Sequence, residues 1–427
     1  MNDPYVQYMY SYPHKLAYEK LCGIDLRQEA NALLRGENSL YFHIPFCQYK
    51  CGYCNLFSLA GKSERQMEAY VDAMQRHAEQ LSGILPKDAV FSDFTLGGGT
   101  PLILPEHLLR RVFSIARDFF GIEPKKQAVV AETSPNQTTE EKLFILKEEG
   151  VNRISIGAQS FQDQELLFLH RFHTAESVKT ALNCIRSMEF ECVNIDMIYG
   201  IPGQTKESLE HSLCQAFAYE PDELFLYPLY VKPQTQLFYE GVIRSGNTFE
   251  LYCFARGILK DAGYRPYSMR RFVKEKQKKG IGEIPVSLCG FGNTVSVGCG
   301  GRSYIGNLHF SAPYAVRPKQ CQDILQNYLE QSDYLEVTHG YRLSQEEVKR
   351  RYVIRHILFG RGVCRKDYRM RFGSEVEGEF PLVLDWIKEG YAKMGEEFLS
   401  LRELGFALSD YLGPMLISDE VREKMKS

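Results

Sequence analysis

The sequence predicts an α/β protein whose main body is a partial, opened (β/α)6 barrel, followed by a small and mostly helical C-terminal domain. Between residues 39 and 245, short apolar segments alternate with amphipathic helical segments, which is typical of a parallel sheet with right-handed crossovers. The alternation gives six βα units, too few for a closed eight-stranded barrel. Glycine-rich stretches follow, and helical patterning returns near the end of the chain.

Each barrel strand is expected at a short apolar segment. In chain order these segments are 40–44, 94–96, 127–132, 153–158, 192–199 and 223–229. Helices are expected between them, and the first begins at a capping box formed by Ser63 and Gln66. We therefore divide the chain into an N-terminal aromatic arm (1–38), the barrel (39–245), a closing segment (246–335) and a winged-helix-like C-terminal domain (336–427).

Composition excludes several classes of partner. The 427 residues include 51 basic and 54 acidic residues, so the net charge of −3 favours neither nucleic acid nor an anionic membrane. No apolar run approaches the ~20 residues of a membrane span, and the N-terminus lacks a basic-then-apolar leader. The 12 cysteines are expected to be reduced thiols in the cytoplasm.

Three cysteines directly follow the first strand. Cys47, Cys51 and Cys54 fall within eight residues, and thiolates at this density hold a zinc ion or an iron–sulfur cluster. A structural zinc site normally has four ligands, so three cysteines indicate a centre with one open position, as in a reactive iron–sulfur cluster. The alternatives are a zinc knuckle with His43 as the fourth ligand, or three unrelated buried thiols.

Other polar and glycine-rich positions fall at the ends of the predicted strands. Gly97, Gly98, Gly99 and Thr100 follow the second strand, and the ends of later strands carry Glu132 and Gln159, with Asp196 inside the fifth. Chemistry gathers at the carboxyl ends of parallel strands, so these residues are expected on one rim with the cysteine loop. The simpler alternative for each residue is a salt bridge or cap at that rim.

The cysteine spacing, CxxxCxxC, resembles the cluster motif of the radical SAM superfamily. The longer string from His43 to Cys47 resembles its oxygen-independent coproporphyrinogen III oxidase-like family. The resemblance implies a [4Fe–4S] cluster on Cys47, Cys51 and Cys54, with S-adenosylmethionine bound at the open iron. It also implies a low-potential electron donor such as flavodoxin or ferredoxin. The positions that match cofactor contacts in the family are Tyr41, Gly98, Gly99, Thr100, Glu132, Gln159, Arg171 and Asp196.

The activity implied is reductive cleavage of S-adenosylmethionine to a 5′-deoxyadenosyl radical that acts on a tetrapyrrole or another organic substrate. No catalytic residue of the protein itself is assigned. One alternative is a C-methyltransferase of the same family that binds two S-adenosylmethionine molecules, the second near Gly290 to Gly301. Another is a haem-binding chaperone that retains the cluster, although its His-Asn-x-x-Tyr-Trp motif is absent and the only tryptophan is Trp386.

Two further features bear on the substrate. Oxidases of the family carry an additional cysteine where this chain has Leu56, which favours a non-oxidase member. The segment from Tyr10 to Pro13 resembles the arm that precedes the oxidase barrel, so it is expected either to reach the active site or to pack on the barrel exterior. No basic run in the barrel half marks a site for four propionates.

Overall fold

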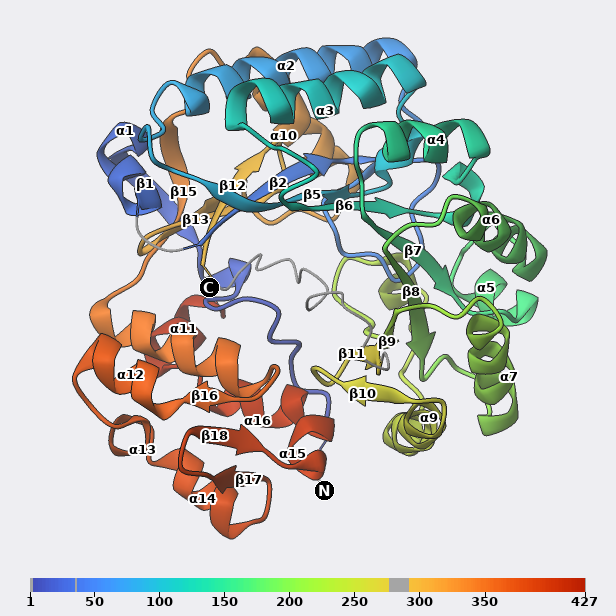
Figure 1. The fold of residues 1–427 in the computed structure, drawn as a ribbon, viewed down its shortest axis with the longest axis vertical. Coiled ribbons are helices and arrows are strands. Elements are labelled where there is room, and N and C mark those ends of the chain that lie inside the picture. Colours follow the sequence, from blue (N-terminus) through green and yellow to red (C-terminus); the bar gives the residue numbers. More distant parts are fainter. Residues whose placement is uncertain (1–2, 35–36, 276–291, 427) are drawn as a thin grey trace.

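The computed structural model describes residues 3–34, 37–275 and 292–426. Its main feature is a 13-stranded mixed sheet that curls into an arc (Figure 1). Six neighbouring strands run parallel in chain order, which confirms the predicted (β/α)6 barrel. They are β2 (Asn38–Ile44), β5 (Phe91–Gly98), β6 (Ala128–Thr133), β7 (Arg153–Gln159), β8 (Cys192–Tyr199) and β9 (Glu223–Pro228).

Helices cover the outer side of this arc (Figure 1). They are α2 (Glu64–Ser82), α3 (Glu106–Phe120), α4 (Glu140–Glu148), α5 (Asp163–Phe168), α6 (Ala175–Ser187), α7 (Lys206–Phe217), α9 (Thr248–Asp261) and α10 (Pro318–Glu330). The predicted capping box is present at the start of α2, where Ser63 and Gln66 satisfy each other's backbone N–H groups. The helix buries one face against the sheet, and this face carries Met67, Tyr70 and Met74.

The sheet extends beyond the six predicted strands on both sides. Strand β12 (Asn293–Val297) pairs in parallel with β2 and places Ser296 opposite Tyr41. This seventh parallel strand is not predicted by the sequence pattern, and it brings the glycine-rich turn after it close to the cysteine loop. The antiparallel strands beyond it are β13 (Arg302–Ile305), β14 (Leu308–Ser311), β15 (Glu336–Arg342) and β1 (Glu19–Asp25); at the other edge lie β11 (Arg271–Lys274) and β10 (Tyr264–Pro266).

Helices α11 to α17 form most of the C-terminal domain, which lies across from the open side of the arc (Figure 1). They are α11 (Gln345–Ile357), α12 (Arg365–Phe372), α13 (Val376–Glu379), α14 (Leu382–Lys388), α15 (Glu403–Ala407), α16 (Ser409–Met415) and α17 (Asp419–Lys424). A small antiparallel sheet of β16 (Val363–Cys364), β18 (Phe398–Leu401) and β17 (Ala392–Met394) packs with them. Met9 and Tyr12 of the N-terminal arm are buried in this domain's apolar core. The arm therefore joins the C-terminal domain to the barrel.

The remaining elements are short. They are η1 (Lys15–Ala17), α1 (Leu26–Glu29), η2 (Ala30–Leu34), β3 (Phe46–Cys47), β4 (Leu59–Ala60), η3 (Pro101–Ile103), η4 (Pro135–Gln137) and α8 (Gln236–Tyr239). Within the described part of the chain, no helix combines the length and apolar character needed to cross a bilayer.

Candidate active site

The three-cysteine loop is fixed at both ends. Strands β3 and β4 pair Phe46 with Leu59 and Cys47 with Ala60, so the loop leaves and rejoins the barrel at one point. In its middle, the Gly52 N–H donates to the Leu169 carbonyl (3.0 Å), and the Gly52 carbonyl accepts from the Leu237 N–H (2.9 Å). All three thiols line a cavity of about 630 Å³. Burial raises the pKa of Cys47 to about 12, so this thiol must lose its proton when it binds a metal.

Every residue predicted to contact S-adenosylmethionine lines the same cavity as the cysteines. These residues are Tyr41, Gly98, Gly99, Thr100, Glu132, Gln159, Arg171 and Asp196. Most lie at or near the carboxyl ends of β2, β5, β6, β7 and β8, and Arg171 lies in the segment after α5. The structure thus brings together residues that are up to 155 positions apart, counting from Tyr41 to Asp196.

The glycine triplet at the carboxyl end of β5 closes tightly on its surroundings. A Cβ atom on Gly99 would lie 2.6 Å from the Phe46 carbonyl oxygen and 2.8 Å from the Cys47 sulfur. A Cβ on Gly97 would lie 2.8 Å from the Glu132 carboxylate, and Gly98 has φ +119°, which disfavours any other residue. The backbone here therefore forms part of the wall between the cysteine loop and the acidic residues.

Two half-buried carboxyl groups, those of Glu132 and Asp196, face this wall. The Glu132 carboxylate accepts from the Gly98 N–H at 3.0 Å, while Asp196 accepts from the Asn194 amide at 2.8 Å. Loss of solvent raises the pKa of Glu132 to about 7 and that of Asp196 to about 6. A cation placed beside them would favour their ionised forms, so the pair is suited to the ammonium or ribose hydroxyls of a cofactor.

Arg171 lies next to the cysteine loop. Its Nη1 is 3.2 Å from the Cys51 sulfur, and its Nη2 donates to the Gly157 carbonyl. Its Nε is buried and has no hydrogen-bond partner among the residues with described positions. Gln159 reaches the same cavity from a left-handed backbone conformation (φ 71°), at an irregularity in the pairing of β7 with β8. Arg171 therefore has a donor available for an anionic group such as a carboxylate.

The zinc-knuckle alternative does not fit the surroundings of His43. Its Nε2 lies 3.0 Å from the Phe57 carbonyl oxygen and its Nδ1 lies 3.4 Å from the Tyr41 hydroxyl, so both ring nitrogens have partners. Across the described ranges, no three histidine, cysteine or acidic side chains gather tightly enough for a single metal ion. A four-iron cluster spreads its thiolate ligands more widely than one ion does, and three cysteines leave its fourth iron open. The donor set therefore fits a cluster.

Comparison with known proteins agrees with this geometry. The family model of the radical SAM superfamily matches residues 41–213, the stretch that holds the cysteine loop and every predicted cofactor-binding residue. This stretch is a radical SAM domain. Members of this superfamily use a [4Fe–4S] cluster and S-adenosylmethionine, and the residues described above would hold both groups in this domain.

The chain is similar to haem chaperones and to oxygen-independent coproporphyrinogen III oxidases. It is 27% identical to the haem chaperone HemW of Bacillus subtilis over 388 residues, which cover 87% of this chain and 97% of that protein. It is 26% identical to the oxygen-independent coproporphyrinogen III oxidase of Pseudomonas aeruginosa over 357 residues, covering 80% of this chain and 76% of that protein. The fold matches coproporphyrinogen III oxidase (HemN) from Escherichia coli with a TM-score of 0.82 at 21% identity, covering 96% of each chain.

A second cavity of about 440 Å³ borders the first. Tyr8, Tyr10, Glu132 and Asp196 line both cavities, so the N-terminal arm stands between them. The second cavity also carries arginines from distant segments, namely Arg153, Arg270, Arg271 and Arg355. The sequence shows no basic run for carboxylates in the barrel half, because these cations come from separate strands, turns and domains and meet only in the fold.

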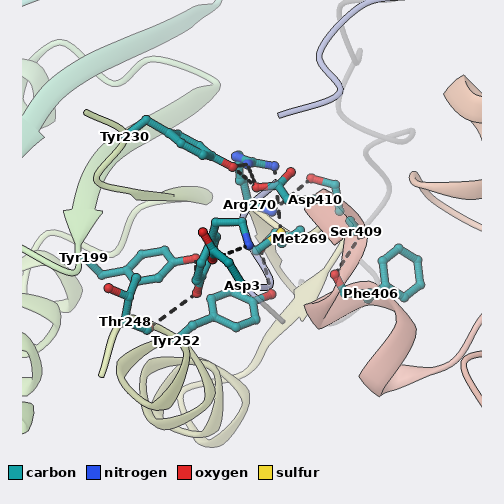
Figure 2. Close-up of polar contacts among 12 residues, drawn as sticks. Asp3, Tyr199, Tyr230, Thr248, Tyr252, Met269, Arg270, Phe406, Ser409 and Asp410 are labelled. Carbon is teal, nitrogen blue, oxygen red and sulfur yellow. Dashed lines mark hydrogen bonds and ion pairs between the residues drawn. The ribbon is translucent and has the colours of Figure 1, made fainter. Parts of the chain in front are cut away.

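A buried ion pair closes the second cavity on the side of the C-terminal domain. Figure 2 shows Arg270, in the turn between β10 and β11, paired with Asp410 at the start of α16; the Tyr230 hydroxyl donates to the same carboxylate. The side chains of Arg270 and Asp410 are 5% and 1% exposed. The Arg270 guanidinium also stacks on the ring of Tyr8, 3.6 Å from its centre. Barrel, arm and C-terminal domain therefore meet at one contact.

Sequence reasoning missed this contact and also the cavity positions of Lys15 and Arg302. The only signal for Lys15 in the sequence is its position beside the tyrosine-rich arm, and the only signal for Arg302 is its position after a glycine-rich stretch. Of the stretch proposed to approach a second cofactor, Gly300 and Gly301 line the first cavity, whereas Gly290 lies outside the described residues.

Proposed function

We propose that this protein is an enzyme that uses its cluster and S-adenosylmethionine to act on a tetrapyrrole held between the barrel and the C-terminal domain. The observation that supports the proposal best is that the three cysteines and all the predicted cofactor residues share one cavity of about 630 Å³. A second space of about 440 Å³ adjoins it, which gives room for a large, flat substrate beside the cofactor. Some relatives are named coproporphyrinogen III oxidase, and this name favours a tetrapyrrole as the substrate.

The residues of the chain would bind and orient. Cys47, Cys51 and Cys54 would hold the cluster, Arg171 the cofactor carboxylate, and Glu132 and Asp196 its ammonium and ribose hydroxyls. Bound there, the cluster and S-adenosylmethionine would supply hydrogen-atom abstraction from the substrate, with one electron from an external low-potential donor such as flavodoxin or ferredoxin. Tyr8 and Tyr10 of the arm would cover the substrate and limit access of water. Reduced cysteines and an oxygen-labile cluster favour the cytoplasm as the site of this reaction.

The fate of the substrate separates two reactions. Leu56 is 52% exposed and lines the cavity at the position where oxidases of the family carry a further cysteine. A leucine cannot take part in thiol chemistry, so we favour a reaction other than propionate decarboxylation, with methyl transfer from a second S-adenosylmethionine as the main alternative.

The test is an anaerobic turnover of the reconstituted protein with dithionite, methyl-labelled S-adenosylmethionine and coproporphyrinogen III. We expect 5′-deoxyadenosine, and methyl transfer would add S-adenosylhomocysteine and a labelled product. Stoichiometric release of CO₂ without S-adenosylhomocysteine would show that the protein is an oxidase despite Leu56. Absence of 5′-deoxyadenosine under every condition would contradict the proposed enzymatic function.

A haem chaperone is the second candidate, because relatives named haem chaperone HemW match as much of the chain as the oxidases do. The only tryptophan, Trp386, is 1% exposed in the C-terminal core, so it cannot reach a haem at the surface. Haem titration followed at the Soret band distinguishes the two functions. Weak, non-stoichiometric binding is expected of the enzyme, and tight one-to-one binding would favour the chaperone.

A further inference from the structure

Lys15 is a buried lysine that faces the main cavity. It is 5% exposed and lines the cavity of about 630 Å³ together with the cysteine loop. No hydrogen bond or ion pair joins its ammonium group to any residue whose position is described. Burial, and next the charge of Arg302, lower the pKa of Lys15 to about 7. Burial of an ammonium group without a partner destabilises the folded protein, so packing alone does not explain a lysine at this position.

Arg302 is the second cation of this region. Its guanidinium donates to the Ser11 hydroxyl (2.7 Å) and to the Tyr10 hydroxyl, and it lies 4.4 Å from the centre of the Tyr10 ring. These partners are neutral, and no carboxylate in the described segments pairs with it. Arg302 follows Gly300 and Gly301, which lie against His43 and Tyr41 of the first barrel strand region. Lys15 and Arg302 are therefore held on the wall next to the cysteine loop.

The neighbouring groups do not neutralise this pair. Lys232 also lines the cavity, and its ammonium lies over the Tyr230 ring at 4.6 Å. His14 is neutral, because burial and the charges of Arg302, Lys232 and Lys15 lower its pKa to about 3. The second cavity differs: Arg153 and Arg271 pair with Glu223, and Arg270 pairs with Asp410. Lys15 and Arg302 thus lack the carboxylate partners that neutralise Arg153, Arg270 and Arg271.

We propose that Lys15 and Arg302 form a binding subsite for a carboxylate of the ligand that fills this cavity. The proposal rests on the proposed function for the identity of that ligand. A carboxylate can accept from the ammonium and the guanidinium at once, which would remove the electrostatic cost of the two unpaired cations. Two sources carry this group into the cavity: a propionate of a tetrapyrrole substrate, or the carboxylate of a second S-adenosylmethionine.

Binding to the full-length, cluster-loaded protein tests the subsite without relying on turnover. The probes are coproporphyrin III, the fluorescent oxidised form of coproporphyrinogen III, and labelled S-adenosylmethionine in equilibrium dialysis. The variants are Lys15→Met, which keeps the apolar stem, and Arg302→Met; Lys20→Met, on the exposed face of β1, is the matched control. We expect Lys15→Met and Arg302→Met each to weaken one ligand by about 10- to 100-fold, with Lys20→Met unchanged.

The two sources give different patterns. Weakened porphyrin binding with unchanged S-adenosylmethionine stoichiometry assigns the subsite to the substrate, and the tetramethyl ester of the porphyrin should then not distinguish Lys15→Met from wild type. Loss of one equivalent of S-adenosylmethionine with unchanged porphyrin binding assigns it to a second cofactor. Either pattern supports the carboxylate subsite.

Thermal stability separates a binding role from a structural one. Because Lys15 is buried without a partner, Lys15→Met should keep or raise the melting temperature of the ligand-free protein while it weakens binding. Wild-type affinity for both ligands in Lys15→Met and Arg302→Met would overturn the proposal, as would a wild-type protein that binds neither ligand. Formation of 5′-deoxyadenosine by the wild type is scored separately, so failure of the proposed function is distinguishable from failure of the subsite.

Discussion

Individual side chains determine when the cavity accepts a cation. Glu132 has a pKa of about 7, raised mainly by burial and also by the nearby Asp196. Only the ionised carboxylate attracts the ammonium group of S-adenosylmethionine, and its fraction grows from about a tenth at pH 6 to about three-quarters at pH 7.5. We therefore expect the affinity for this cofactor to rise several-fold over that interval, and Asp196 acts in the same direction.

Glu132→Gln tests this dependence, because glutamine can still accept from the Gly98 N–H but cannot ionise. Isothermal titration of S-adenosylmethionine between pH 6 and 7.5 should give a weaker affinity with a flatter profile. Glu140→Gln, at the exposed start of α4, is the control and should follow the wild type. An unchanged pH profile in Glu132→Gln would show that this carboxylate does not contact the cofactor.

Gly99 determines whether the cysteine loop can close on its ligand. The Cβ atom of Gly99→Ala would collide with the Phe46 carbonyl at 2.6 Å and the Cys47 sulfur at 2.8 Å, so the loop must shift. We expect the variant to incorporate less than half of the wild-type iron and sulfide on anaerobic reconstitution. Gly257→Ala, on α9 with no atom within 4 Å of the added methyl group, should incorporate the wild-type amount. Equal iron content in the two variants would show that the space beside Gly99 is not needed for cluster binding.

Contacts between elements hold the C-terminal domain against the barrel. Asp410→Ala leaves the Arg270 guanidinium buried without its carboxylate (Figure 2), and breaking a buried pair in this way costs about 3–5 kcal/mol. We expect that loss in the free energy of unfolding, with faster hydrogen exchange in α16 and in β10 to β11. Asp385→Ala is the matched control in the same domain; it breaks an ion pair with Lys388 whose side chains are 59% and 76% exposed, and it should cost less than about 1 kcal/mol. Similar losses in both variants would show that Arg270 and Asp410 do not hold the domains together.

The sequence predicts elements well where the signal is local. The six barrel strands each form a short apolar run before a helix. The capping box is a signal of only four residues, from Ser63 to Gln66, and it marks the start of α2. Strand β12 has no such context, because it follows a glycine-rich stretch and its partner β2 lies about 250 positions earlier in the chain. Pairing at that separation depends on the closure of the whole sheet, so the seventh parallel strand could not be predicted from local pattern.

The candidate site divides in the same way. The cluster loop and the residues at the strand ends could be predicted because their motifs are contiguous and parallel strands share one rim. Lys15 and Arg302 come from an N-terminal arm and from β13, which the fold brings together across 287 positions, counting from 15 to 302. The ion pair of Arg270 and Asp410 likewise joins two domains. Such pairs carry no periodicity or spacing in the sequence.

At the scale of the molecule, three parts of the chain build one active-site region. The barrel supplies the cysteine loop and the wall formed by the glycine triplet. The arm supplies Tyr8, Tyr10 and Lys15, and the C-terminal domain closes the second cavity. The enclosure suits a reaction in which a reactive radical must meet its substrate and not water. The central claim is therefore that the cavity holds a redox-active cluster on its three cysteines.

The most direct test of that claim is formation of 5′-deoxyadenosine by the anaerobically reconstituted, dithionite-reduced protein, compared between wild type, Cys51→Ala and Cys214→Ala. Cys51 lines the cavity, whereas Cys214 is an exposed thiol on α7. We expect wild type and Cys214→Ala to form the product at the same rate and Cys51→Ala to form none above background. Equal 5′-deoxyadenosine formation by Cys51→Ala would contradict the assignment of the cluster.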